Sequence, residues 1–145
     1  MLGLATGPAA AELDREDIVY PGPYLAEVTR IYDGDTVTVR AHIWPDHVLK
    51  ISVRLEGIDT PEIRGRCQAE EDAAVQARDF VANIAEQENN VLWVRDVQLG
   101  KYAGRVLGKL QTRMGADVGT MLINNGLAVP YEQRREQRQR LCPNL

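Results

Sequence analysis

Two short acidic motifs, each at the end of an apolar run, constrain the fold of this 145-residue chain more than any other feature. The first, Asp33-Gly34-Asp35, lies between runs in which apolar and polar residues alternate, and such an Asp-Gly pair is a strong signal for a β-hairpin. The second, Asp59-Thr60-Pro61-Glu62, follows the run Val53-Arg54-Leu55. Carboxylates gathered near a core are unfavourable unless a cation or hydrogen-bond donors face them. We therefore expect a hard metal cation at these strand ends.

The alternation continues along the chain and predicts a small barrel. Five β segments are expected: from Tyr24 towards the Asp33-Gly34 turn, Val37–Ile43, Val48–Leu55, Val91–Leu99 and Val106–Leu110. Trp44-Pro45-Asp46 is the expected turn of a second hairpin, and Gly100–Gly104 is the turn between the last two strands. About five short strands joined by tight turns are typical of an OB-type Greek-key barrel.

About three helices are expected beside the strands. Over Cys67–Glu86, apolar residues recur at three- and four-residue steps, which indicates an amphipathic helix. Asp117 is a good N-cap for a short helix at residues 118–125, and Gly126 follows where glycine commonly ends a helix. The arginine-rich segment Glu132–Leu141 is helix-prone, and we expect it to present a solvated face. Strands with added helices in this order place the fold in the α+β class.

Composition limits the organisation and the partners of the chain. A hydrophobic fraction of 44% and a charged fraction of 26% are ordinary for a soluble globular protein. No apolar run approaches the roughly 18–20 residues that span a bilayer, so we expect no membrane partner. The net charge of -4 is unusual for a protein that grips a polyanion by broad electrostatics, so any such grip would be local or mediated by a cation. We expect one domain over residues 21–145 and a monomer.

The ends of the chain and its two cysteines bear on the compartment. Residues 1–20 form an alanine-rich and then acidic lead-in that we expect to be flexible. The run Pro8-Ala9-Ala10-Ala11 resembles a signal cleavage site, without the positive region that would precede it, so a signal-peptide remnant and a flexible start both stay open. Cys67 and Cys142 suit a periplasmic or secreted protein with one disulfide, and two unrelated thiols are the alternative.

Hard oxygen ligands are concentrated at the two acidic motifs. Asp35, Asp59 and the carbonyl of Thr60 suit calcium, which accepts six to eight oxygens in flexible geometry. Magnesium demands a stricter octahedral shell and fits this set less well. His42 and His47 lie on the second hairpin, where we expect exposed polar residues rather than metal ligands.

Three further charged side chains suit chemistry beside such a metal. Glu62 follows Asp59 closely and is a candidate general base for a metal-adjacent water. Arg54 and Arg105 are candidates to fork onto phosphate oxygens and to stabilise the charge of a pentacoordinate transition state. Each of these residues alone also has a structural interpretation, as part of a turn, a helix start or a surface ion pair. Their combination favours phosphodiester chemistry.

The order Asp-Gly-Asp-Thr-Val, Arg-Leu-x-x-x-Asp-Thr-Pro-Glu and Lys-Tyr-x-Gly-Arg resembles the staphylococcal nuclease (thermonuclease) family over roughly residues 27–131. The resemblance implies an OB-fold barrel with three helices. It also implies calcium-dependent cleavage of DNA and RNA that leaves 3′-phosphate ends. A non-catalytic OB module that binds nucleic acid or protein is the alternative, because this barrel is often reused for binding.

The resemblance also implies roles for individual residues. Calcium would be held by the side chains of Asp35 and Asp59 and by the Thr60 carbonyl, with Asp33 beside these ligands. Arg54 and Arg105 would hold the scissile phosphate, and Glu62 would be the general base. Lys101 and Tyr102 would contact a neighbouring phosphate, and Tyr131 would flank the base.

Four departures from the family pattern concern the grip on substrate rather than bond cleavage. A short Ile63–Arg66 segment replaces a lysine-rich loop, and Ala103 is inserted in the Lys-Tyr-Gly-Arg run. Tyr131 stands alone where the family has a pair, and the last helix is short. We expect a bond between Cys67 and Cys142 to tie this tail to the start of the long helix, in place of a longer last helix.

Overall fold

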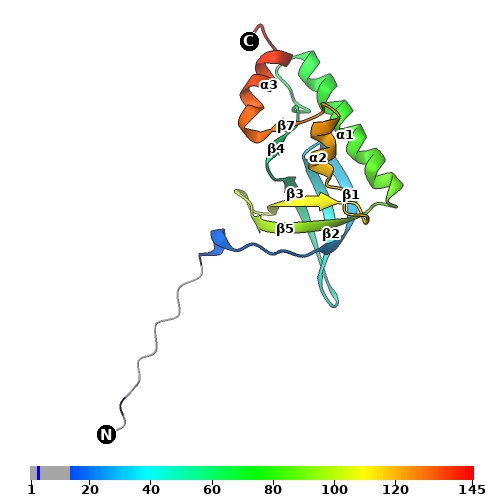
Figure 1. Cartoon of the computed structure of the whole chain (residues 1–145), viewed down its shortest axis with the longest axis vertical. Helices are drawn as coiled ribbons and strands as arrows, with labels where there is room; N and C mark the ends of the chain where they lie inside the picture. The colour runs from blue at the N-terminus through cyan, green and yellow to red at the C-terminus, as the bar shows by residue number, and fades with distance from the viewer. Residues whose placement is uncertain (1–2, 4–13) are drawn as a thin grey trace.

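The computed structural model of the chain describes residue 3 and residues 14–145, and a closed barrel of five strands forms its centre (Figure 1). The strands are β1 (Tyr24–Asp33), β2 (Thr36–Trp44), β3 (His47–Leu55), β5 (Val91–Leu99) and β6 (Arg105–Gln111). Their order around the barrel is β1-β2-β3-β6-β5, with β3 and β6 parallel and the other neighbours antiparallel. The expected α+β architecture with an OB-type barrel is confirmed.

There are three α-helices among the described residues. α1 (Gln68–Gln87) and α2 (Val118–Asn124) pack against the barrel, and α3 (Arg134–Leu141) packs against α1. The buried face of α1 carries Ala77, Val81 and Ile84, which join the barrel residues in one core. These positions recur at helical spacing, and burying them against the strands stabilises both elements. Asp117 caps α2 by accepting a hydrogen bond from the Thr120 amide at 2.9 Å, as the sequence predicted.

The two hairpins confirm the alternation seen in the sequence. In β2, Val37, Val39 and Ala41 point into the core while the residues between them are more exposed. The register of β1 against β2 shifts twice, between Val28 and Arg30 and between Ile31 and Asp33. Such bulges bend a strand and increase its twist, which helps a short sheet to close.

Two very short strands were not predicted. β4 (Ile58–Asp59) pairs with β7 (Val129–Pro130) in a separate two-stranded sheet. A pair of residues has no periodicity to detect, so the sequence gives no signal for it. This small sheet brings the segment after β3 next to the segment that leads into α3.

Part of the expected lead-in is tied to the barrel. A 3-10 helix spans Arg15–Asp17, and Tyr20 exchanges two backbone hydrogen bonds of 2.8 Å with Val97. The expectations for residues 1–2 and 4–13, including the signal-like run, lie outside the described residues. None of the described helices is long and apolar enough to cross a membrane.

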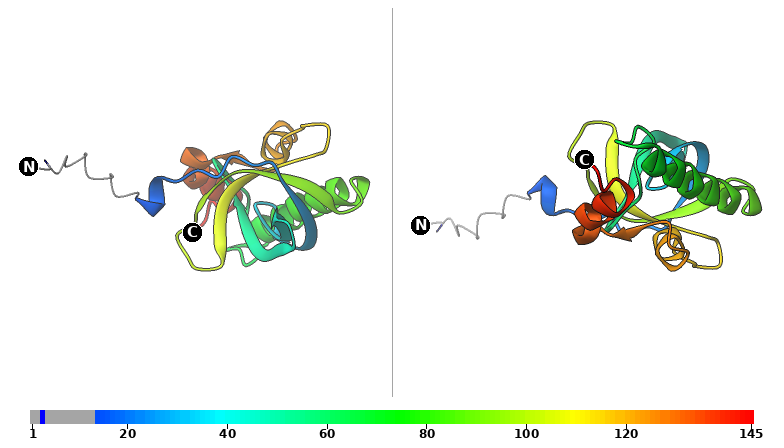
Figure 2. Two further views of the ribbon diagram at one scale, coloured as in Figure 1. Left: turned by 90° about the horizontal axis from the view of Figure 1, so that it is seen from below. Right: turned by 90° about the horizontal axis from the view of Figure 1, so that it is seen from above.

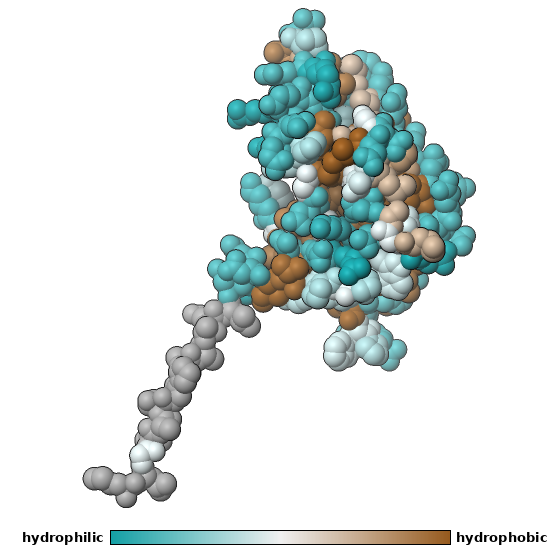
Figure 3. Space-filling view, in the orientation of Figure 1, coloured by the Kyte–Doolittle hydropathy of each residue, from teal (hydrophilic) through white to brown (hydrophobic). Residues whose placement is uncertain are grey.

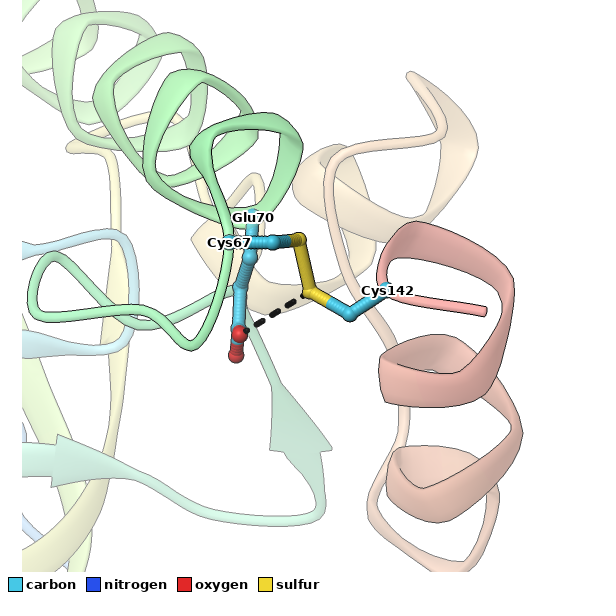
Figure 4. Close-up of side chains that lie close together, drawn as sticks. All are labelled: Cys67, Glu70 and Cys142. Carbon is cyan, nitrogen blue, oxygen red and sulfur yellow. Dashed lines mark hydrogen bonds between the residues drawn. A yellow bond between two sulfur atoms is a disulfide. The ribbon is translucent and has the colours of Figure 1, made fainter. Parts of the chain in front are cut away.

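Cys67 and Cys142 form a disulfide between residues 75 apart in sequence, which decides between the two interpretations of the cysteines (Figure 4). Cys67 is the N-cap residue of α1, and Cys142 directly follows α3. The bond therefore ties the tail to the start of the long helix. Both further views show α3 beside this end of α1 (Figure 2). A disulfide is compatible with an oxidising, extracellular or periplasmic environment.

Candidate active site

Arg54 connects the two acidic motifs. Its guanidinium Nη1 lies 2.9 Å from Asp35 Oδ2, and its Nη2 lies 3.3 Å from Asp59 Oδ1. The pairing of β2 with β3 sets Arg54 opposite Thr36, directly after the first motif. Nη1 also donates to the carbonyl of Ile58 at 3.2 Å, and the side chain is 13% exposed. This arginine therefore supplies positive charge to both acidic motifs.

The first acidic motif folds as a tight turn fastened to the second. The Asp35 amide donates to Asp33 Oδ1 at 3.1 Å, and Asp35 Oδ2 accepts a hydrogen bond from the Thr60 amide at 3.0 Å. A Cβ on Gly34 would lie 2.8 Å from the side chains of both Ala77 and Thr60. Glycine is therefore required where the turn packs between the long helix and the second motif.

Asp59 is held from the opposite side by α3. The buried side chain of Gln137 donates from Nε2 to Asp59 Oδ2 at 3.3 Å. This residue was not predicted, because a glutamine among arginines is typical of a solvated helix. The expectation of a solvated face for Glu132–Leu141 is therefore wrong in part, since one side of α3 contacts the site.

Burial and a neighbouring negative charge raise the pKa of one carboxyl group in the first motif, that of Asp33. Burial, followed by the negative charge of Asp35, raises the pKa of Asp33 to about 8. Asp33 and Asp35 are both nearly inaccessible to solvent, with 5% and 4% exposed. The charge of a neighbouring carboxylate disfavours the ionised form of Asp33, and a cation bound nearby would relieve that cost.

The carboxyl groups of the second motif also have raised pKa values. Burial, followed by the charge of Asp35, raises the pKa of Asp59 and of Glu62. Arg54 and Arg138 oppose the rise at both carboxylates without cancelling it. Carboxylates that stay difficult to ionise beside two arginines mark a place where further positive charge is stabilising.

The two acidic motifs carry oxygen donors, which are the kind of atom that a hard cation prefers. Asp35, Asp59 and the Thr60 carbonyl offer oxygen ligands, and they belong to two segments held together by the hydrogen bond from Thr60 to Asp35. The Oγ1 atom of Thr60 is buried and has no hydrogen-bond partner within residues 14–145. A buried oxygen without a partner, close to carboxyl groups whose pKa is raised, is consistent with a site for a cation.

A cleft of about 580 Å³ opens over these motifs. Of the residues predicted from the sequence, the structure brings seven to its lining, namely Arg54, Asp59, Glu62, Lys101, Tyr102, Arg105 and Tyr131. Asp35 and Thr60 are buried and do not line the cleft. Asp35 forms an ion pair with Arg54, which does line it, and accepts a hydrogen bond from the Thr60 amide. The two histidines lie away from it on the exposed second hairpin, as expected.

Two arginines of α3 also line the cleft and were not predicted. They are Arg134 and Arg138. The Arg134 guanidinium stacks over the ring of Tyr131, 4.1 Å from its centroid, and donates to the Tyr131 carbonyl at 3.0 Å. One face of the predicted base-contacting ring is therefore covered by a cation. The spacing of four in Arg134 and Arg138, which places both on one helix face, is the signal that could have found them.

Comparison with protein families gives one result. A family model described as a staphylococcal nuclease homologue matches residues 52–143, which is more than half of the chain. The matched range contains Arg54, Asp59, Glu62 and Arg105, whereas Asp35 precedes it. A comparison with curated proteins finds no match.

Proposed function

Because the chain belongs to the staphylococcal nuclease homologue family, we propose that it is a nuclease that hydrolyses phosphodiester bonds of DNA or RNA. The observation that carries the proposal is the position of Arg54. It bridges the carboxylates of Asp35 and Asp59 at the wall of a cleft that also contains Glu62 and Arg105. The cleft thus places two arginines for a phosphate beside Asp59 and Glu62, and Asp35 lies buried behind its wall, bridged to Asp59 by Arg54.

The proposed cofactor is calcium, held by Asp35, Asp59 and the carbonyl of Thr60. All three offer hard oxygens, and magnesium, with its stricter geometry, fits them less well. When bound, the divalent cation supplies positive charge to the phosphate and lowers the pKa of a coordinated water. The surplus negative charge at Asp33, Asp59 and Glu62 supports a cation at this position.

The roles of the remaining side chains follow from their charge and place. Glu62 is exposed in the cleft, and its raised pKa brings it nearer the range in which a carboxylate accepts a proton from water at neutral pH. Arg54 and Arg105 each present a planar fork of donors that matches phosphate oxygens. As charge develops on the phosphoryl oxygens, their attraction to both guanidinium groups increases.

The proposed reaction is an attack by water on the phosphorus, with Glu62 accepting the proton of that water. The bond between phosphorus and the 5′-oxygen breaks, the 5′-oxygen takes a proton, and the 3′-phosphate end remains. Lys101, Tyr102 and Tyr131 line the same cleft and would hold the neighbouring nucleotides. Stacking by Tyr131 would use the ring face that Arg134 leaves open.

The proposed location is outside the reducing cytoplasm, in the periplasm or the medium. It rests on the disulfide between Cys67 and Cys142, because such bonds persist mainly in oxidising compartments.

The test is cleavage of single-stranded DNA and RNA with calcium, compared with EDTA and with magnesium. We expect calcium-dependent products that carry 3′-phosphates, and a loss of turnover of roughly 10²- to 10⁴-fold in Glu62→Gln. Glu56→Gln is the matched control, because Glu56 is also exposed in the cleft lining. Binding of nucleic acid without cleavage under all conditions would favour the alternative of a binding module.

A further inference from the structure

Arginines without acidic partners are concentrated at one end of this acidic protein. α3 contains four arginines and one glutamate, and Arg64 and Arg66 precede α1. None of these arginines takes part in an ion pair among the described residues. Hydrophilic residues gather over α3 on the surface shown in Figure 3. Arg138 lies near enough to Asp59 and Glu62 to affect their pKa, whereas Arg66 and Arg135 form no ion pair among the described residues and leave positive charge for a ligand.

A second cavity continues the catalytic cleft along these arginines. It has a volume of about 450 Å³ and is lined by Arg66, Arg135, Arg138, Gln139, Cys142 and Leu145. Arg138 lines both this cavity and the cleft. Positive side chains therefore follow one another from Arg105 in the cleft, through Arg138, to Arg66 beyond it.

A hydrogen bond and the disulfide hold the backbone around the second cavity in place. Arg66 is next to Cys67, and its amide donates to the buried carboxylate of Glu70 at 2.8 Å. Figure 4 shows Glu70 beside the disulfide that joins this loop to the end of α3. Arginines on a fixed backbone lose less conformational entropy when they bind a ligand than arginines on a free tail.

We propose that Arg66, Arg135 and Arg138, called here the α3 arginine face, bind the sugar–phosphate backbone of a polynucleotide whose scissile phosphate lies in the cleft. This inference rests on the proposed function and extends it, since it gives the strand a second binding surface outside the cleft. Phosphate is the fitting ligand because guanidinium forks match its oxygens and because the face joins the cleft at Arg138.

The experiment measures binding rather than cleavage, so that it is independent of the nuclease proposal. Fluorescein-labelled dT16, dT4 and U16 are titrated in EDTA over a range of salt concentrations, and anisotropy gives the dissociation constant. In Arg66→Gln/Arg135→Gln we expect binding of dT16 and U16 to weaken by about tenfold at low salt. The slope of log K against log salt should become shallower by about 1.4, since each phosphate contact on a single strand contributes about 0.7.

Two further variants separate a specific contact from a general loss of charge. Arg15→Gln/Arg30→Gln removes the same charge from exposed residues that line neither cavity, and it should keep the wild-type slope. Arg66→Lys/Arg135→Lys retains the charge and should recover most of the slope. The loss should also be smaller for dT4, which is too short to contact the whole face.

The outcomes separate the two proposals. An unchanged salt slope in Arg66→Gln/Arg135→Gln, or an equal change in Arg15→Gln/Arg30→Gln, would overturn the α3 arginine face even if the protein cleaves DNA. A shallower slope confined to the first pair would support the face even if no cleavage is found.

Discussion

At the scale of single residues, Arg54 combines a structural and a proposed catalytic role. Its guanidinium lies within 3.3 Å of Asp59 and 2.9 Å of Asp35, and little of it is exposed. Removing one partner of a buried ion pair leaves the other charge uncompensated. A loss of activity in an Arg54 variant would therefore have two possible causes, and a stability measurement is needed to separate them.

Arg54→Gln should lower the free energy of unfolding by about 3 kcal/mol in EDTA, because Asp35 and Asp59 lose their shared counter-charge. Arg105→Gln should abolish cleavage with a change below about 1 kcal/mol, because Arg105 has no ion pair among the described residues. Urea unfolding and cleavage rates measured on both variants check this. Equal stabilities of the two variants would contradict the bridging role of Arg54.

At the scale of elements, α3 is where the sequence and the structure differ most. The strands, α1 and α2 were predictable from local patterns. Apolar residues recur every two residues in the strands and every three to four residues in the helices, so a short stretch of sequence is enough to detect them. The contact between Gln137 and Asp59 joins residues 78 apart and depends on how α3 docks. The acidic motifs are contiguous in sequence and were predictable. Their neighbours on α3 were not, because no local pattern encodes how a helix docks.

The disulfide is the bond that fixes this docking, and removing it should affect both stability and the site. Cys67→Ser/Cys142→Ser frees a long loop in the unfolded chain, which should lower the free energy of unfolding by about 4 kcal/mol. Cleavage should also fall, because Gln137 and Arg138 approach Asp59 and Glu62 from α3. Urea unfolding and cleavage assays measure both effects.

The matched control for the cysteine variant is the native chain under a phosphine reductant, which should show the same loss. A variant as stable and as active as the native chain would contradict the view that this bond positions α3.

At the scale of the whole molecule, the carboxyl groups of Asp33 and Asp59 are buried at the site, while Glu62 and several arginines line the cleft. Asp33, Asp59 and Glu62 all have raised pKa values, and burial is the first cause at each. A carboxyl group whose pKa is higher in the folded state than in the unfolded chain binds more protons when folded. Stability without metal must therefore decrease as the pH rises through that interval.

For Asp33 the interval runs from its ordinary pKa of 3.8 to about 8. The contribution of this group is neutral below the lower value, becomes increasingly unfavourable between them and is fully unfavourable above about 8. We expect the free energy of unfolding in EDTA to fall between pH 5 and pH 8, measured by urea titration. Added calcium should stabilise the protein more at pH 8 than at pH 5, because protons compete with it for the carboxylates.

Asp33→Asn should reduce this dependence on pH, since the amide cannot ionise. Asp46→Asn, at the exposed turn of the second hairpin, is the matched control and should retain it. A native pH dependence in Asp33→Asn would exclude Asp33 as its source.

The disulfide also affects what happens to the molecule when its backbone is cut. The exposed Lys101–Gly104 turn lies between Cys67 and Cys142 in sequence. Exposed turns are preferred sites of proteolytic cleavage. A single cut there would divide the chain into two pieces that remain covalently joined, with α3 still attached to α1. The molecule is therefore built so that the parts of its cleft stay together after such damage.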